Sequence, residues 1–236
     1  MMSGSIRLFV SDALFAGATI TPSAAQAHYL GSVMRRGVGD TLRLFNGSDG
    51  EFSARIASLR RDKAVLAVES LLRPQASETD LWLAFALLKR DATDLLVQKA
   101  TELGVAALLP VCTERTQATR VNLARLGAIA IEAAEQSERL SVPALHAPVA
   151  LPALLAGWPG ERRLFVALER ADSAPLRPAS GPAAILIGPE GGFSPNDRVA
   201  MTFSQKCLPV SLGPRILRAE TAAIVALALL QARSCG

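Results

Sequence analysis

The chain of 236 residues has little sulfur and few aromatic rings. Its three cysteines, Cys112, Cys207 and Cys235, are odd in number and far apart, and no Cys-x-x-Cys pair or cysteine–histidine cluster accompanies them. This spacing supports neither a disulfide framework nor a zinc site, so we expect no bound metal. Unpaired cysteines are typical of a reducing compartment, which predicts a cytoplasmic protein.

Histidines and long hydrophobic runs are also scarce. The two histidines, His28 and His146, fit neither a Ser-His-Asp arrangement nor an HExxH motif, which disfavours a hydrolase or a metalloenzyme. The amino terminus has no basic segment followed by a long apolar stretch, so we expect no signal peptide. The apolar run 222–230 is too short to cross a bilayer.

Arginine, by contrast, is abundant. Four lysines leave 21 of the 25 basic residues as arginine, the better bidentate ligand for phosphate. Residues 1–75 carry nine basic and six acidic side chains (net +3), and residues 76–236 carry sixteen and fifteen (net +1). The amino-terminal part is thus the more basic per residue, as in an RNA-docking module, although an ordinary solvated surface explains the charge equally well.

The first third of the chain reads as short strands joined by turns, which favours a small β-barrel. The expected strands cover residues 6–10, 40–45, 52–59 and 63–71, and a short helix is expected at 26–35. Asn46-Gly47 and Asp49-Gly50 are hairpin signals. Residues 73–78 read as a linker, so we expect two domains, at 1–73 and 77–236.

From residue 81 on, strands and helices alternate, which predicts an α/β domain with a mostly parallel sheet covered by helices on both faces. Expected strands cover 81–87, 105–111, 164–168, 183–187 and 208–212. Expected helices cover 91–103, 122–137, 151–155, a segment starting at Ser194, and the last stretch to about residue 233. Asp91 or Thr93 is the expected cap of the first of these helices, with Gly104 just past its end. The last helix is apolar almost all round, so it is buried either in the core or at a subunit interface.

Two glycine-punctuated turns stand out near the carboxyl terminus. The first, GPEGG, follows the apolar run 183–187, and the second, LGPRIL, starts at Leu212. Turns at the carboxyl ends of strands form the crevice where open α/β sheets bind ligands. Neither turn matches GxGxxG or a Walker A loop, which disfavours a nucleotide-binding oxidoreductase.

These blocks resemble the signature of the RsmE-type ribosomal RNA methyltransferases of the SPOUT superfamily. The resemblance runs along nearly the whole chain. It is carried by YLGSVMR from Tyr29, QKATELGV from Gln98, ERT from Glu114, EAAEQS from Glu132 followed by Arg139, LIGPEGGFS from Leu186 and LGPRILRAETAA from Leu212. The chain departs from the pattern at Glu138, where the family usually has glycine.

The resemblance implies a PUA-like amino-terminal barrel and a trefoil-knotted α/β domain. It further implies an S-adenosylmethionine-dependent homodimer, with its active sites at the subunit interface, that methylates N3 of a uridine in 16S rRNA of the 30S subunit. The cofactor-binding residues that it implies belong to the two turns and their flanks: Leu186, Ile187, Gly188, Pro189, Glu190, Gly191, Leu212, Gly213, Ile216, Leu217, Arg218 and Thr221.

Methyl transfer to N3 demands that the uridine lose its proton. Arg215 and Arg218 flank the second turn, and an arginine near a base carbonyl stabilises the uridine anion. Glu220 and Glu135 are both candidates to accept the proton, and the residues do not decide between them. Arg139 is expected to help position the rRNA at the active site. Residues expected to contact RNA are Arg35, Arg36, Arg43, Arg60, Arg61, Lys89, Arg115 and Gln136.

Two alternatives stay open at this point. A second methyltransferase of the superfamily would share the cofactor turns but act on another RNA position or on a ribose 2′-hydroxyl. A non-catalytic ribosome-assembly factor would keep the fold and RNA binding but lack turnover. Both glycine turns and both arginines are present, which argues against the second alternative.

Overall fold

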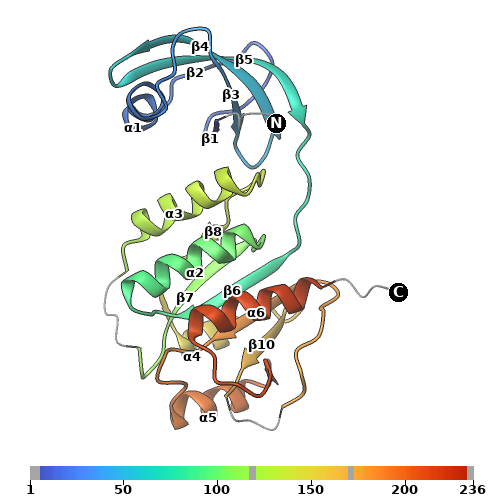
Figure 1. Cartoon of the computed structure of the whole chain (residues 1–236). Coiled ribbons are helices and arrows are strands. Elements are labelled where there is room, and N and C mark those ends of the chain that lie inside the picture. Colours follow the sequence, from blue (N-terminus) through green and yellow to red (C-terminus); the bar gives the residue numbers. More distant parts are fainter. Residues whose placement is uncertain (1–5, 117–120, 170–172, 233–236) are drawn as a thin grey trace. The chain divides into compact units, whose positions relative to one another are not determined.

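The computed structural model describes residues 6–116, 121–169 and 173–232. The chain divides into two compact units, and each is discontinuous in sequence (Figure 1). The first comprises Met1–Ser77 and Ala134–Val142, and the second comprises Glu78–Ala133 and Pro143–Gly236. The sequence-based ranges assign residues 134–142 to the carboxyl-terminal domain, whereas this division assigns them to the amino-terminal unit.

The first unit is built on a five-stranded sheet in the order β1-β3-β4-β5-β2. Its strands are β1 (Arg7–Phe9), β2 (Thr19–Ile20), β3 (Thr41–Phe45), β4 (Glu51–Arg60) and β5 (Lys63–Arg73). β1 pairs with β3 in parallel, and the other pairs are antiparallel. The predicted hairpin turn at 46–50 is confirmed, because Phe45 pairs with Glu51 across it.

The core of this unit follows the alternation of its strands. Leu42 and Leu44 of β3 are buried, as are every second residue of β4 and β5 around them, because successive side chains of a strand point to opposite faces. The predicted helix at 26–35 appears as α1 (Ala24–His28), with a capping box formed by Ser23 and Gln26, and a single π-helical turn, η1 (Tyr29–Val33).

The second unit contains a sheet whose strand pairs are all parallel. The order is β12-β10-β11-β6-β7-β8, with β9 also pairing with β7. The strands are β6 (Leu81–Ala86), β7 (Ala107–Cys112), β8 (Ala144–Leu145), β9 (Val149–Ala150), β10 (Arg163–Ala167), β11 (Ala183–Ile187) and β12 (Cys207–Val210). Every residue of the central strand β11 is buried, which explains its uninterrupted apolar sequence.

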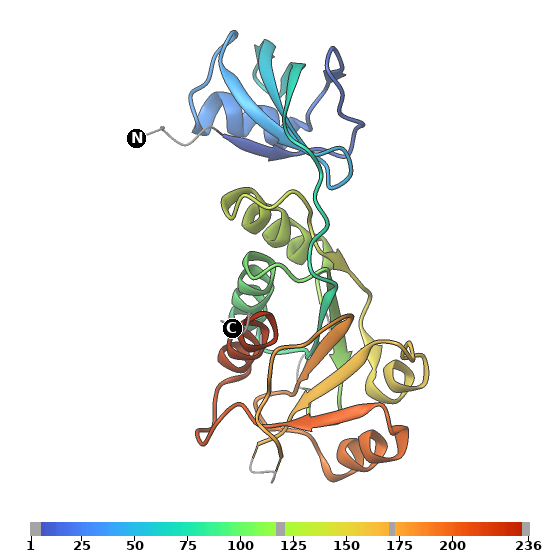
Figure 2. The same ribbon diagram turned by 90° about the vertical axis from the view of Figure 1, so that its right-hand side faces the viewer.

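Helices cover both faces of this sheet, as predicted (Figure 2). On one side α2 (Arg90–Glu102) packs on α6 (Ala219–Gln231), and α6 also packs on β11. On the other side α4 (Leu151–Ala156) packs on α5 (Pro195–Ser204), and both contact the sheet. The remaining helix, α3 (Leu123–Gln136), passes from the second unit into the first at Ala134.

The helix ends test the local rules of the sequence. Ser194 is the N-cap of α5 and forms a capping box with Asp197, as its sequence predicts. The predicted cap of α2 is wrong: Lys89 is the N-cap, and the Thr93 hydroxyl donates to the Leu88 carbonyl from inside the helix. α6 ends at Gln231, and residue 233 lies outside the described residues. Among the described residues, no helix is both long and apolar enough to span a membrane.

Candidate functional site

A cavity of about 640 Å³ lies at the carboxyl ends of three neighbouring parallel strands. Its walls come from the segments after β10, β11 and β12 and from the first turn of α6. The lining residues are 167–169, 187–190, 192, 193, 198, 211–219 and 222. This position is where open parallel sheets bind ligands, and the volume is typical of a small-molecule site.

The first glycine turn forms one wall and leaves little room for side chains. A Cβ atom at Gly188 would lie 3.0 Å from the ring of Phe193, which is buried beneath the turn. The absence of a side chain at Gly188 therefore makes room for the Phe193 ring, and both residues line the cavity. The turn leads directly into the capping box of α5.

Neighbouring loops hold this turn in place through polar contacts. Arg115 Nη1 donates to the Gly191 carbonyl at 2.8 Å, and the Lys89 amide donates to Glu190 Oε1 at 3.5 Å. Asn196 Nδ2 donates to Glu114 Oε1 at 2.7 Å. Hydrogen bonds from Ser194 and Asn196 hold the pKa of the Glu114 carboxyl below its usual value. The loop after β7 thus fixes the turn after β11.

The second glycine turn forms the opposite wall. Gly213 has a φ of +113°, a backbone conformation that side chains with a Cβ rarely adopt, and its amide donates to Ser211 Oγ at 3.2 Å. Ile216 is 58% exposed although it is large and apolar, and an exposed apolar side chain at a cavity is typical of a ligand-binding surface. Leu212 and Leu217 are half-buried beside it.

Positive charge gathers where the second turn enters α6. Arg215 and Arg218 are exposed and line the cavity, and Arg218 is the N-cap residue of α6 without a side-chain capping bond. A cation is slightly unfavourable at a helix amino terminus, so this placement costs stability and points to a role in ligand binding. Glu220, in the first turn of α6, is half-buried and does not line the cavity.

Most residues expected to bind a cofactor meet at this cavity. Ile187, Gly188, Pro189, Glu190, Leu212, Gly213, Ile216, Leu217 and Arg218 all line it. The other three do not: Leu186 packs in the core between sheet and helices, and Gly191 and Thr221 are exposed outside the lining. Two charged lining residues escaped the sequence argument, Glu169 just after β10 and Arg198 in α5. Only the position of Glu169 after an apolar strand offered a signal.

The remaining candidates for chemistry lie in the first unit. Glu135 Oε1 accepts the Phe9 amide at 2.9 Å, so its carboxylate serves the barrel structure. Arg139 is 8% exposed, and its Nη2 donates to Ser141 Oγ at 3.1 Å. Arg215, Arg218 and Glu220 belong to the second unit.

The residues expected to bind RNA divide into two groups. Arg35, Arg60, Arg61, Lys89 and Gln136 are exposed, and Arg36 is half-buried. Two others have partners within the protein: Arg115 bonds to Gly191, and Arg43 Nη2 pairs with Glu138 Oε1 at 2.9 Å. Arg35 and Arg61 have left-handed backbones, with φ of +52° and +47°, so each sits at a sharp turn of the barrel surface.

The chain matches two family models. Residues 75–231 match the RNA methyltransferase domain, and residues 23–69 match the RNA methyltransferase PUA domain. A relative named ribosomal RNA small subunit methyltransferase E from Rickettsia conorii is 36% identical over 94% of this chain and 93% of its own. The protein of that name from Synechocystis sp. is 35% identical over 96% of this chain and 77% of its own.

Two solved structures resemble the chain over almost its full length. A Legionella pneumophila protein described as a methyltransferase with bound SAM has a TM-score of 0.86 and 32% identity, covering 96% of this chain and 97% of its own. A ribosomal RNA small subunit methyltransferase E from Neisseria gonorrhoeae, bound to S-adenosylmethionine, has a TM-score of 0.85 and 29% identity. The match covers 95% of this chain and 96% of that one.

Proposed function

The chain belongs to the family of ribosomal RNA small subunit methyltransferase E, and from that premise we propose that it methylates N3 of one uridine in 16S rRNA with S-adenosylmethionine. The observation that carries the proposal is the cavity where two glycine turns and two arginines meet. The predicted α/β fold with a PUA-like amino-terminal domain is confirmed. The trefoil knot stays a prediction.

The cavity fits the proposed cofactor. Its apolar surface, from Leu212, Ile216 and Leu217, suits the faces of an adenine ring, and the bare backbone around Gly188 and Gly213 suits the ring edges. S-adenosylmethionine supplies, when bound, a methyl group on a positively charged sulfur. The residues that hold it in this proposal are those of the two turns that line the cavity, together with Arg218.

The reacting uridine needs help from the protein because N3 carries a proton at neutral pH. Arg215 and Arg218 stabilise the anion by opposite-charge attraction to the base carbonyl oxygens, and their planar guanidinium groups can hydrogen-bond there. Their exposed positions at the cavity wall support this role. Two carboxylates stay candidates to accept the proton: Glu220, which lies in the first turn of α6 close to Arg218, and Glu135.

The rRNA partner is held, in this proposal, by the barrel. The exposed Arg35, Arg60 and Arg61 and the half-buried Arg36 supply phosphate contacts, and Gln136 and, in the second unit, Lys89 add polar ones. The small ribosomal subunit is the expected substrate. The thiols of Cys112 and Cys207 are free, which suits the reducing cytoplasm where we place the reaction.

We further propose that two copies of the chain associate through α6. Ala222, Ala223, Ala226, Leu227 and Leu230 of this helix are buried within the unit, whereas Ile224, Val225 and Leu229 remain partly exposed. A helix that is apolar on both sides has a second surface to cover. Sedimentation analysis should give a dimer for the native chain, and Ile224→Glu should shift it towards a monomer.

A methyl-transfer assay tests the proposed function. The protein is mixed with labelled S-adenosylmethionine and 30S subunits from cells that lack the enzyme, and the product is mapped by reverse transcription. N3 methylation blocks the pairing edge, so we expect one stop at a uridine in 16S rRNA and 3-methyluridine on nucleoside analysis.

The other outcomes identify the alternatives. Label in RNA without a reverse-transcription stop would indicate transfer to a ribose hydroxyl or to an atom outside the pairing edge. Cofactor binding without any label on 30S subunits would indicate a different RNA or an assembly factor. Absence of S-adenosylmethionine binding would contradict the assignment of the cavity itself.

A further inference from the structure

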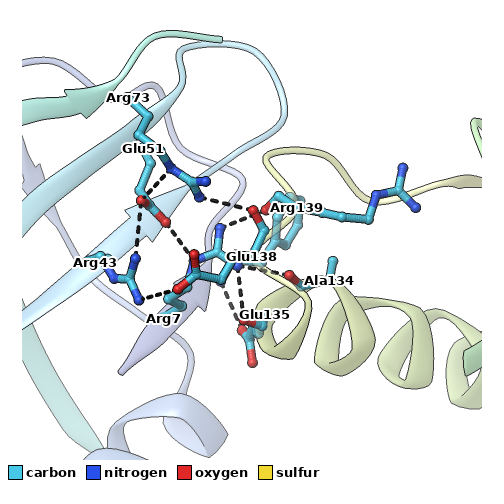
Figure 3. A network of polar contacts seen from close by, with 9 residues as sticks. Arg7, Arg43, Glu51, Arg73, Ala134, Glu135, Glu138 and Arg139 are labelled. Carbon is cyan, nitrogen blue, oxygen red and sulfur yellow. Dashed lines mark hydrogen bonds and ion pairs between the residues drawn. The ribbon is translucent and has the colours of Figure 1, made fainter. Parts of the chain in front are cut away.

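A buried arginine in the first strand holds the end of α3. The Arg7 side chain is 3% exposed, and Nε donates to Glu51 Oε1 at 2.5 Å. Nη1 donates to the carbonyls of Ala134 and Glu135 at 2.8 and 2.9 Å, and Nη2 donates to the Arg139 carbonyl at 2.6 Å. Figure 3 shows these bonds converging on one guanidinium group. Arg7 thus binds two carbonyls in the last turn of α3 and one in the segment that follows it.

Two further arginines complete the network within the first unit. Arg73 Nε donates to Glu51 Oε2 at 2.9 Å, and its Nη2 donates to the Glu138 carbonyl at 3.0 Å. Arg43 Nη1 lies 3.6 Å from Glu51 Oε2, and Arg43 Nη2 forms an ion pair with the Glu138 carboxylate. Residues 134–139 are therefore held at both the main chain and a side chain.

The charges of this network require the end of α3. Arg7, Arg43 and Arg73 bring three positive charges, and Glu51 and Glu138 bring two negative ones. The carboxyl end of a helix carries partial negative charge, so the carbonyls of Ala134 and Glu135 stabilise the Arg7 guanidinium group. Without them Arg7 would be buried with unpaired donors, which is unfavourable. The barrel therefore needs this segment as part of its own structure.

The segment also carries an arginine that points elsewhere. Arg7 donates a hydrogen bond to the Arg139 backbone carbonyl, whereas the Arg139 side chain points away from Glu51 (Figure 3). Glu138, immediately before it, has a left-handed backbone with φ of +58°, which is uncommon for a residue other than glycine. The Arg43–Glu138 ion pair and the Arg73 bond to the Glu138 carbonyl hold that turn.

We infer that Arg7 and Glu51 are positioning residues for the methyl transfer. They act through the end of α3, by fixing the backbone that carries the exposed Gln136 side chain and the buried Arg139 side chain. This inference rests on the proposed function, because it concerns how the substrate is placed. Neither Arg7 nor Glu51 contacts the cofactor cavity.

The test compares substitution of an exposed glutamate of the network with substitution of a glutamate in an ion pair outside it. Glu138→Gln removes a carboxylate that is 57% exposed, so the variant should fold. Glu69→Gln is the control, because Glu69 pairs with Arg55 at 2.8 Å on the same barrel but outside the network. Arg7→Lys is the stronger variant, since one ammonium group cannot reach four acceptors.

Three quantities are measured for each folded variant: hydrogen exchange of residues 137–142, the Kd for S-adenosylmethionine, and kcat on 30S subunits. We expect Arg7→Lys to speed exchange in 137–142, where the Arg139 amide donates to the Ala134 carbonyl, and to lower kcat about tenfold or more. Glu138→Gln should do the same to a smaller degree. The cofactor Kd should stay within about twofold, and Glu69→Gln should match the native protein.

Each other outcome is decisive. Unchanged exchange in both variants would show that the network does not hold the segment. Faster exchange with native kcat would show that the segment is held but that its position is irrelevant to transfer. If the native protein methylates no RNA, the proposed function fails, and exchange alone then decides whether Arg7 holds the end of α3.

Discussion

Arg218 occupies a position that local helix chemistry disfavours, because it places a cation at the amino terminus of α6. We expect Arg218→Ala to abolish methyl transfer, since the uridine anion loses its stabilisation. The Kd for S-adenosylmethionine should stay within about tenfold, because the apolar wall and glycine turns remain. Titration calorimetry and the labelled-methyl assay measure the two effects, and Arg163→Ala, at the exposed first residue of β10, is the control. Native activity of Arg218→Ala would discard the role.

Glu51 makes the first unit sensitive to acid. Burial tends to raise the pKa of its carboxyl, but hydrogen bonds from Arg73 and Arg7 outweigh that effect, so the pKa lies below its ordinary value of 4.5. The folded protein therefore binds this proton more weakly than the unfolded chain does. The resulting stabilisation is present above pH 4.5 and is lost as the pH falls through the folded pKa.

Glu51→Gln tests this linkage. Removal of one partner of a buried ion pair costs about 3–5 kcal/mol, so the variant should unfold more easily at pH 7. Its stability should also change less between pH 6 and the acid limit than that of the native protein. Urea unfolding across the pH range measures both, and parallel curves for the two proteins would show that Glu51 does not set the acid dependence.

At the scale of elements, the two glycine turns are the parts that shape the cavity. Gly213→Ala places a Cβ at a φ of +113° and should destabilise the protein by about 1–2 kcal/mol and weaken cofactor binding. Gly127→Ala is the matched control: this glycine lies within α3 with open space around it, so alanine should stabilise by up to about 1 kcal/mol. Thermal unfolding with and without cofactor distinguishes the two. If the two variants had the same thermal stability and the same stabilisation by cofactor, the second glycine turn would not shape the cavity.

Elements whose signals are local were predicted well from the sequence. The start of α5 follows from Ser194 and Asp197 alone, because a capping box needs only residues three apart. The alternation of strands and helices, and the turn at 46–50, are likewise local patterns. β2 was missed because two residues carry no periodicity. The first strand offered no sign that Arg7 binds carbonyls more than 120 residues away.

The site divides in the same way. The glycine turns and their flanking arginines could be read from short motifs, and nine of the expected residues line the cavity. That Arg115 contacts RNA stays a prediction, whereas its hydrogen bond to the Gly191 carbonyl was not foreseen. Nothing near Arg115 in sequence points to a turn 76 residues later. The pairing of Arg43 with Glu138 was hidden for the same reason.

For the whole molecule, the arginine-rich barrel predicts binding that depends on salt. Replacement of Arg35 and Arg36 by glutamine should weaken 30S binding and reduce the slope of log K against log salt by about one to two units, since each phosphate contact contributes about 0.7–0.9. Arg55→Gln is the control, because Arg55 is held by Glu69 on the same barrel. Filter binding at several salt concentrations gives the slopes. A slope equal to that of the native protein would place the RNA elsewhere.

The bonds from Arg7 to the end of α3 also bear on how the chain folds as it is made. Arg7 leaves the ribosome well before its last acceptor, the Arg139 carbonyl, which is 132 residues further on. At a synthesis rate of about 5–20 residues per second, the nascent barrel waits roughly 7–26 s for that partner. During this delay a charged guanidinium group must stay hydrated, so the amino-terminal unit reaches its native state only after Glu78–Ala133 of the second unit have been translated.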